Sequence, residues 1–376
     1  MSSQASPRLI DAGRQLSLTS PSGDLLFDAL WLRERAPDAD TLDPLTGQRL
    51  IEAAELPLDL SITTLETNNG SLVLGFSDGH TASFLIEDLH QSHALHTGED
   101  ISLWDANLES VPQASFTAAM ADDQALLAML EALHRYGFVR VDDVPCEVDG
   151  MQPLIDRIGP LRQTNWGGIA DVRSVADAYD LTMTQRGLEP HTDNPYRDPI
   201  PGFIWLHCLT NAADGGDSTL VDGFEAARRL RVEDPQAFDC LTRVRPDFRY
   251  HDDGTRLDSS GPLIETDGNN KVVRVRYNNR TERVAALPSE QLRDYYAARQ
   301  SFYRLITSDE LTLKLKLNPG QMLIMDNYRL LHGRTSFQLS GGVRHLRQGY
   351  VDRDSTQSRR QWLRDQLNTN HQGVVA

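Results

Sequence analysis

Short runs in which apolar and polar residues alternate dominate the first 95 positions of the chain. SLVLGF (71–76) and HTASFLI (80–86) repeat with a period of two, which is typical of strands that bury one face. The triplets NNG (68–70) and SDG (77–79) supply turn-forming residues before each run. This pattern predicts a small N-terminal domain, β-rich or of the α+β kind, over residues 1–95.

A different period begins after a polar stretch, HQSHALHTGED (90–100), which we expect to link two domains. Leucines recur at helical spacing in ADDQALLAMLEALHRYGFVRV (121–141), behind an acidic first turn. Gly137 predicts the end of this helix because glycine is favoured just beyond a helix C-terminus. The segment therefore predicts a helix that is followed directly by the strand FVRV.

Strands outnumber helices in the remainder of the chain. Apolar runs predict strands at 203–209, 217–222, 271–278, 320–326 and 344–351, and helical spacing predicts helices at 224–231 and 289–306. The connections between these strands are long and irregular, unlike the regular crossovers of a βα repeat. We therefore expect a mainly β, jelly-roll-like core with flanking helices over residues 110–376.

Composition narrows the possible partners. The 376 residues carry a formal net charge of −17, so the average surface would repel nucleic acid and anionic membranes. The charge weakly favours a cationic ligand, although acidity that only aids solubility is the commoner meaning. Three scattered cysteines predict neither a disulfide framework nor a zinc finger. Without an apolar run of signal-peptide or membrane-helix length, we expect a cytoplasmic protein.

The segment LEPHTDNPYRDP (188–199) raises the possibility of a metal site. His191 and Asp193 are two residues apart, which in a strand would turn an imidazole and a carboxylate to the same side. Alone, the pair is a weak signal, because 11 histidines and 54 acidic residues produce such a match by chance. The stretch YHDDGT (250–255) is a competing group, which we interpret as a solvated loop beside a turn.

A third ligand strengthens the metal hypothesis. MDNYRLLHGRTSF (325–337) carries His332 behind an apolar strand, and two histidines with one carboxylate form the facial triad that binds Fe(II) and leaves coordination positions open. The next strand carries Arg344, whose guanidinium could grip a dicarboxylate in bidentate fashion. Taken singly, these residues are more often a packed histidine and a surface arginine. Their order and spacing together favour the site.

Several motifs occur in one order along the chain: WLRER (31–35), PHTDNP (190–195), GGDSTLVDGF (215–224), MDNYRLLHGRTSF (325–337) and RHLRQGYVDRD (344–354). Over nearly the whole chain they resemble the γ-butyrobetaine dioxygenase family of Fe(II)/2-oxoglutarate oxygenases. The resemblance implies a distorted double-stranded β-helix core with a small N-terminal domain. It implies that His191, Asp193 and His332 hold Fe(II). Arg344 would bind the distal carboxylate of 2-oxoglutarate, with Ser218 beside it. It also implies O2 as a substrate, ascorbate as a supporting reductant, and an assembly that can be a homodimer.

The sequence departs from the family at its structural zinc site. The family carries three cysteines in the loop after WLR, which bind zinc together with a histidine. Ala36, Asp38 and Thr41 stand at these positions here, and only His80 is retained. One histidine and one aspartate do not make a closed zinc site. We therefore expect no structural zinc.

The substrate pocket of the family encloses a trimethylammonium group in aromatic side chains, because a quaternary cation is attracted to π faces. Tyr350 and Trp166 match positions of this cage. A second tryptophan position is Ala170 here. Either Tyr179 or Met183 would complete the cage, and the sequence leaves this choice open.

At the opposite end of the substrate, the family uses an asparagine to hold a carboxylate. Asn278 matches that residue, and Arg280 follows where a small residue is common. An added guanidinium suits a phosphonate, which carries nearly two negative charges. That Arg280 points to solvent is the alternative. Together the changes resemble family members that hydroxylate 2-(trimethylammonio)ethylphosphonate, at the carbon next to phosphorus, with succinate and CO2 as the other products.

Other functions remain open at this point. Within the same enzyme class, hydroxylation of γ-butyrobetaine would give carnitine, and sulfonates and trimethyllysine are less favoured substrates. A non-catalytic betaine-binding protein would use the aromatic cage and the arginines alone, but the complete triad argues against it. A zinc hydrolase could use the same three ligands, but it would leave Arg344 without a role.

Overall fold

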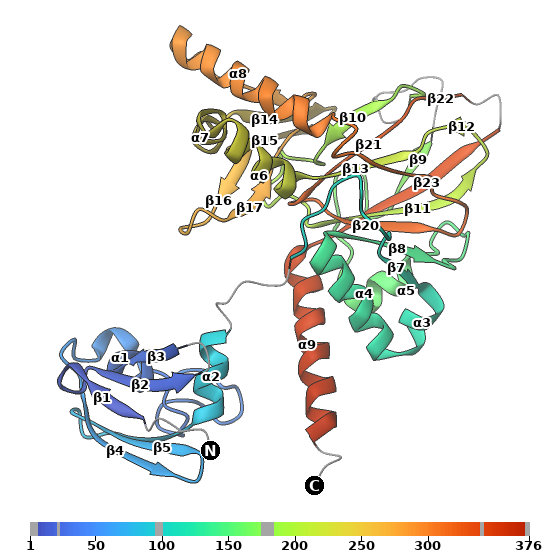
Figure 1. Cartoon of the computed structure of the whole chain (residues 1–376). Helices are drawn as coiled ribbons and strands as arrows, with labels where there is room; N and C mark the ends of the chain where they lie inside the picture. The colour runs from blue at the N-terminus through green and yellow to red at the C-terminus, as the bar shows by residue number, and fades with distance from the viewer. Residues whose placement is uncertain (1–6, 21–22, 95–100, 174–183, 339–341, 373–376) are drawn as a thin grey trace. The chain divides into compact units, whose positions relative to one another are not determined.

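The chain divides between residues 100 and 101 into two units, each with its own apolar core (Figure 1). This computed structural model describes residues 7–20, 23–94, 101–173, 184–338 and 342–372. Within this described part, no helix is long and apolar enough to cross a bilayer.

Two three-stranded antiparallel sheets enclose the core of the first unit, with a short helix after each. The elements are β1 (Arg8–Ile10), β2 (Gln15–Ser20), β3 (Gly23–Asp28), α1 (Ala29–Arg33), β4 (Ile62–Asn68), β5 (Ser71–Phe76), β6 (Thr81–Leu85) and α2 (Ile86–Ala94). Alternate residues of β5, Leu72 and Leu74, are fully buried, as the period of two predicts. Asn69 and Gly70 both have positive φ, which explains the NNG turn signal. Helix α2 includes part of the stretch expected to be a linker.

Polar contacts occupy the positions that the resemblance assigns to zinc ligands. Asp38 Oδ2 lies 2.8 Å from His80 Nε2, and Arg33 Nη1 donates to Thr41 Oγ1 at 3.1 Å. Ala36 is completely buried in the apolar core of the unit. The absence of a structural zinc stays a prediction.

Two sheets form the centre of the second unit. The larger has the strand order β7-β8-β20-β11-β23-β9, and the smaller has the order β10-β21-β13-β19. The strands are β7 (Gln113–Ser115), β8 (Phe138–Asp142), β9 (Ala170–Arg173), β10 (Leu188–His191), β11 (Phe203–Asn211), β13 (Ser218–Asp222), β19 (Leu313–Leu315), β20 (Met322–Asp326), β21 (Leu330–Arg334) and β23 (Arg344–Val351). All neighbours in these two sheets are antiparallel except β7 and β8.

Strand β11 shows how the larger sheet is covered on both faces. Phe203 and Trp205 pack into a core with helices α3 (Phe116–Ala121), α4 (Asp123–Tyr136), α5 (Gln152–Ile158) and α9 (Arg353–Gln372). The alternate residues Ile204 and Cys208 pack with Leu220 of the smaller sheet. The two sheets therefore share an apolar layer, as in a jelly roll.

Helix α4 has the limits that its sequence predicts. The Asp122 carboxylate caps it by accepting a hydrogen bond from Ala125 N–H at 2.8 Å. Gly137, with φ of 77°, ends it and donates its N–H to Leu133 O. Strand β8 then begins at Phe138.

A third group of elements packs beside the smaller sheet around a separate core (Figure 1). It contains α6 (Gly223–Glu233), α7 (Pro235–Arg243), α8 (Ser289–Ile306), β14 (Asp247–Asp252), β15 (Thr255–Ser260), β16 (Ile264–Thr266), β17 (Val272–Val275) and β18 (Glu282–Arg283). Two short strands, β12 (Asp214–Gly215) and β22 (Phe337–Gln338), pair with each other elsewhere in the unit.

Two local predictions need correction here. YHDDGT is no solvated loop, because Tyr250 to Asp252 belong to β14 and the DG pair closes the β14–β15 hairpin. The strand expected at 271–278 ends at Val275, because Tyr277 and Asn278 leave it to bond with Thr192. Tyr277 N–H donates to Thr192 Oγ1 at 3.1 Å, and Asn278 Nδ2 donates to Thr192 O at 3.0 Å.

His207 is a buried titratable residue in the middle of the larger sheet. It lies on β11 between Met322 of β20 and Arg347 of β23, with no exposed surface. Neither ring nitrogen has a hydrogen-bond partner within the described part of the chain. Burial lowers the pKa of His207 from 6.5 to about 4, so the ring is neutral at neutral pH.

We expect the free energy of unfolding to fall as the pH drops from 6.5 to about 4, with His207 as one cause. In this window the unfolded chain binds a proton that the folded chain excludes, so acid favours unfolding. The contribution has an upper limit of about 3 kcal/mol. Denaturant titrations on the wild type and on His207→Met measure it. Because methionine does not titrate, the variant should lose less stability than the wild type; an equal loss would contradict the assignment.

Candidate active site

The pairing of β10 with β21 brings two histidines together. His191 lies directly opposite His332, and Leu220 of β13 lies opposite His332 on its other side. The two imidazole centroids are 4.3 Å apart. Gly333 permits this close strand pairing, because a Cβ there would lie 2.4 Å from Leu188 O. Residues distant in the sequence thus form one face of a site.

Asp193 reaches the same site by a route that the sequence did not predict. It lies in a bend beyond the end of β10, so strand alternation does not orient it. The side chain of Asn327, which is completely buried, holds its backbone instead. Asp193 N–H donates to Asn327 Oδ1 at 2.7 Å, and Asn327 Nδ2 donates to Asp193 O at 2.9 Å. The turn after β20 therefore places the carboxylate.

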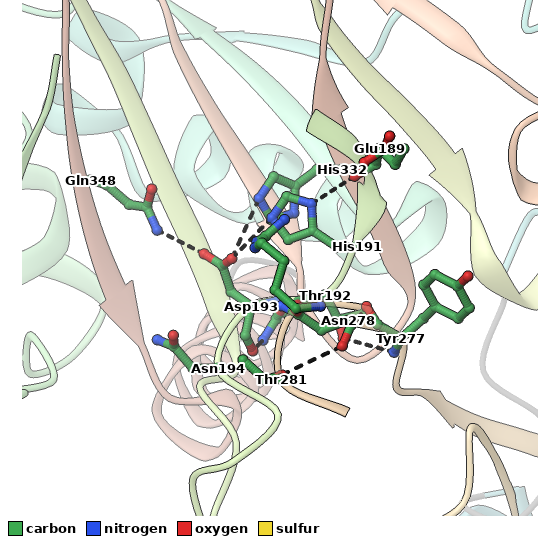
Figure 2. A network of polar contacts seen from close by, with 12 residues as sticks. Glu189, His191, Thr192, Asp193, Asn194, Tyr277, Asn278, Thr281, His332 and Gln348 are labelled. Carbon is green, nitrogen blue, oxygen red and sulfur yellow. Dashed lines mark hydrogen bonds and ion pairs between the residues drawn. The ribbon is translucent and has the colours of Figure 1, made fainter. Parts of the chain in front are cut away.

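The three side chains converge with the geometry of a metal site (Figure 2). Asp193 Oδ1 lies 3.4 Å from His191 Nε2 and 3.7 Å from His332 Nε2. One ligand atom from each residue lies within 4.8 Å of the others. His191 Nδ1 is 2.9 Å from the carbonyl oxygen of Glu189, a contact that fixes the proton on Nδ1 and leaves the Nε2 lone pair free.

The charge states of His332 and Asp193 suit a divalent cation. Burial, reinforced by neighbouring His191, lowers the pKa of His332 to about 3, so its imidazole is neutral. Burial opposes ionisation of Asp193, but the adjacent His332 and His191 and a hydrogen bond from Tyr350 hold its pKa below the ordinary value. Two imidazoles and one carboxylate form a donor set that Fe(II) accepts.

Two residues of β23 bind the second oxygen of the metal-site carboxylate. Asp193 Oδ2 accepts hydrogen bonds from Tyr350 Oη and from Gln348 Nε2, each at 2.8 Å. Burial and neighbouring Asp193 raise the pKa of Tyr350 well above its usual value, so the phenol remains a donor. Tyr350 was expected to line a substrate cage, and it does line the cavity. The role of Gln348 carried no signal in the sequence.

A cavity of about 900 Å³ adjoins the triad. Its charged lining contains six arginines and two aspartates, a balance opposite to that of the whole chain: Arg173, Arg249, Arg280, Arg334, Arg344, Arg347, Asp171 and Asp193. Arg347 is neutralised by Asp171 at 2.7 Å. Among the described residues, no carboxylate forms an ion pair with Arg173, Arg280 or Arg344. The cavity is therefore suited to anionic ligands.

Arg344 is the most deeply buried of these three cations, with 5% of its surface exposed. Its Nε meets no hydrogen-bond acceptor in the residues that the structure describes, and burial lowers the pKa of Arg344. The ring of Phe337 lies 5.3 Å from its Cζ, and a Cβ on Gly216 would lie 3.1 Å from its Nε. Ser218 is buried on β13 and lines the same cavity. A fixed, unneutralised guanidinium is what a buried carboxylate requires.

An aromatic group lines another part of the cavity. Tyr250 lies between Trp166 and Tyr196, with centroid distances of 5.2 Å to Trp166 and 5.1 Å to Tyr196. Of the three rings, Trp166 was expected from the sequence, whereas the two tyrosines were not. Tyr196 stands within the metal motif itself, which is a signal that could have identified it. Tyr250 stands in the stretch dismissed as a loop.

Other expected substrate contacts have mixed outcomes. Tyr179 and Met183 lie outside the described residues. Ala170 lines the cavity. Asn278 is largely committed to the backbone, because its Nδ2 donates to Thr192 O and its Oδ1 accepts from Arg280 N–H at 3.2 Å. Arg280 is exposed yet lines the cavity, and its charge helps to lower the pKa of His332 after burial and His191.

Known proteins share both the sequence pattern and the fold. The family described as "Taurine catabolism dioxygenase TauD, TfdA family" matches residues 99–350. A γ-butyrobetaine dioxygenase from Pseudomonas sp. (strain AK-1) is 33% identical over 342 residues, which cover 89% of this chain and 89% of that protein. The mitochondrial trimethyllysine dioxygenase of Rattus norvegicus is 28% identical over 352 residues, covering 90% of this chain and 83% of that protein.

Among solved structures, a taurine dioxygenase from Burkholderia xenovorans superimposes with a TM-score of 0.51. Its sequence identity is 16%, and the alignment covers 67% of this chain and 91% of that chain. At this identity the similarity bears on the fold alone. It agrees with the jelly-roll core, and the expected fold class is confirmed.

We expect Arg344→Met to raise the unfolding free energy of the ligand-free protein by about 1 kcal/mol, because an unneutralised buried charge is removed. Glutarate, a simple dianion, should raise the melting temperature of the wild type and leave that of the variant unchanged. Thermal denaturation with and without glutarate measures both effects. Arg173→Met is the matched control, since this exposed arginine costs no desolvation. A variant that glutarate still stabilises would show that Arg344 is not the anion site.

Proposed function

Because the chain belongs to the TauD, TfdA dioxygenase family, and within it resembles the γ-butyrobetaine dioxygenases throughout, we propose that it hydroxylates 2-(trimethylammonio)ethylphosphonate at the carbon next to phosphorus. The chain is an Fe(II)- and 2-oxoglutarate-dependent dioxygenase that acts on a small trimethylammonium compound. Membership of this enzyme class excludes the two alternatives from other classes, a betaine-binding protein and a zinc hydrolase. The proposal concerns which trimethylammonium compound is the substrate and which residues bind it.

We assign the iron ligands to His191, Asp193 and His332, whose donor atoms converge within 4.8 Å of one another. Arg344 binds the distal carboxylate of 2-oxoglutarate, and Ser218 contributes a hydroxyl to the same end. Iron, 2-oxoglutarate and O2 would together supply the oxidation: one oxygen atom of O2 replaces a C–H bond of the substrate with C–OH, and the other enters succinate as 2-oxoglutarate loses CO2. The protein's part is to bind, orient and neutralise charge.

The aromatic group formed by Trp166, Tyr196 and Tyr250 receives the trimethylammonium end of the substrate. A quaternary cation has no hydrogen to donate, so ring faces are its best protein partners. Tyr250 contacts both other rings, which fixes the relative orientation of the three side chains. The ring of Tyr350 lines the same cavity and adds a further apolar surface.

The position of Arg280 is the observation that favours a phosphonate over a carboxylate as the anionic end of the substrate. It lines the cavity, it has no carboxylate partner among the described residues, and its charge acts on His332. A phosphonate offers three acceptor oxygens and nearly two charges to such a guanidinium. Asn278 has one amide hydrogen left to donate beside it. A substrate held by the aromatic group and by Arg280 leaves its carbon chain inside the cavity that contains the triad.

γ-Butyrobetaine is the second candidate, since of the two relatives reported above the one with the higher identity, 33%, is an enzyme named for it. Both compounds carry the same cation and differ at the anion. The choice therefore rests on the groups around Asn278 and Arg280.

The decisive experiment measures succinate formed by anaerobically purified protein with Fe(II), 2-oxoglutarate and ascorbate after O2 is added. The two candidate substrates are assayed in parallel, and the masses of the products are determined by mass spectrometry. We expect stoichiometric succinate and a product heavier by one oxygen with the phosphonate. The same result with γ-butyrobetaine alone would keep the enzyme class and refute the argument from Arg280.

Arg280→Ala should weaken use of the phosphonate and shift preference towards γ-butyrobetaine. We expect kcat/KM for the phosphonate to fall by about ten- to a hundredfold, because one charge-assisted contact to the anion is lost. Arg280→Lys should keep part of the activity, since it preserves the charge without the planar fork. Steady-state kinetics with both substrates measure the shift. An equal fall for both compounds would remove Arg280 as a determinant of specificity.

A further inference from the structure

The two oxygens of the Asp193 carboxylate have different surroundings. Oδ1 faces the imidazole nitrogens of His191 and His332. Oδ2 accepts hydrogen bonds from Gln348 and Tyr350, and Figure 2 shows Gln348 reaching it from the side away from the imidazoles. The carboxylate therefore presents one oxygen to the metal side and has the other engaged by protein donors.

The amide hydrogens of Gln348 and the hydroxyl hydrogen of Tyr350 all have acceptors within this group of three residues. Gln348 Nε2 donates one hydrogen to Asp193 Oδ2 at 2.8 Å and the other to Tyr350 Oη at 2.7 Å. Tyr350 Oη then donates its single hydrogen to Asp193 Oδ2. The reversed amide would place the Gln348 carbonyl oxygen against the carboxylate, so the network itself fixes the amide orientation.

Both donors stand on rigid backbone. Gln348 and Tyr350 are alternate residues of β23, so their side chains leave the same face of the sheet. Strand β23 pairs with β11, where Leu206 is opposite Gln348 and Ile204 is opposite Tyr350. Strand β9 covers the other edge, with Ala170 opposite Gln348. The two donors are thus fixed independently of Asn327, which holds the backbone of Asp193.

We propose that Gln348 and Tyr350 are positioning residues that restrict Asp193 to binding the metal through one oxygen. To bring Oδ2 round to the metal, the carboxylate would have to break both hydrogen bonds. Holding it to one oxygen keeps a coordination position open for the other reactants. This inference rests on the proposed role of Asp193 as a metal ligand, and it does not depend on the identity of the substrate.

The role of Tyr350 as a donor is separable from a role of its ring in the substrate cavity. Tyr350→Phe removes the hydroxyl and keeps the ring, so a pure cage function would survive it. Gln348→Leu removes the amide at similar length. Tyr328→Phe is the matched control, because its hydroxyl is 3.3 Å from Ile200 O and makes no contact with Asp193.

The test loads each apoprotein with Co(II), without 2-oxoglutarate, and measures the Co(II) affinity and the d–d absorption spectrum. Single variants should bind Co(II) about tenfold more weakly and the double variant up to about a hundredfold more weakly, which is the range for outer-shell partners of metal ligands. The spectrum of the double variant should change, because Oδ2 becomes free to join the coordination sphere. Tyr328→Phe should match the wild type in both.

Asp193→Ala separates this inference from the assignment beneath it. If Asp193→Ala loses Co(II) while Tyr350→Phe and Gln348→Leu match the wild type in affinity and spectrum, the positioning role is wrong and the metal site stands. If Asp193→Ala binds Co(II) like the wild type, the ligand assignment itself falls. Should Gln348→Leu fail to fold, as judged by its melting curve, Tyr350→Phe decides alone, because it removes a single oxygen atom.

Discussion

The register between β10 and β21 is the constraint on which the site depends. It sets His191 opposite His332, and every other functional group is placed relative to that pair. A slip of one residue would turn one histidine to the opposite face of the smaller sheet and separate the imidazoles. The register is protected on both sides: β13 fixes β21 from its other edge, and Asn327 holds the chain just beyond β10. The metal site therefore depends first on the pairing of β10 with β21, and only then on which side chains stand at the paired positions.

Much of this could be predicted from the sequence, for identifiable reasons. Helix α4 and strand β5 carry their own local signals, in the form of caps, periodicity and turn residues. The three metal-site residues were recognised because their types and order are rare together. Tyr250, Gln348 and Asn327 were not recognised, because each acts through a partner far away in the chain, and Tyr196 was overlooked although it stands within the metal motif. Asp193 was predicted as a ligand for a partly mistaken reason, because hydrogen bonds from the side chain of Asn327, rather than strand alternation, orient it.

The cavity reverses the electrostatic character of the chain. The protein as a whole carries a formal charge of −17, yet arginines outnumber acidic residues around the triad. The overall charge, which weakly favoured a cationic ligand, therefore gave no indication of this cationic lining. A surface that repels anions in general, combined with a small region that attracts them, favours a ligand compact enough to enter that region.

The distances in sequence between the parts of the site have a consequence for biosynthesis. Asn327 is 134 residues from Asp193, and Tyr350 is 157 residues from it. A nascent chain that has emerged only through β13 already contains His191 and Asp193. It still lacks Asn327, which holds the backbone of Asp193, and β21, which carries His332. Pairings of such range form late in folding because a long loop must first close. The ability to hold iron thus appears only when the last strands dock, so an incomplete chain on the ribosome has no assembled centre at which oxygen could react.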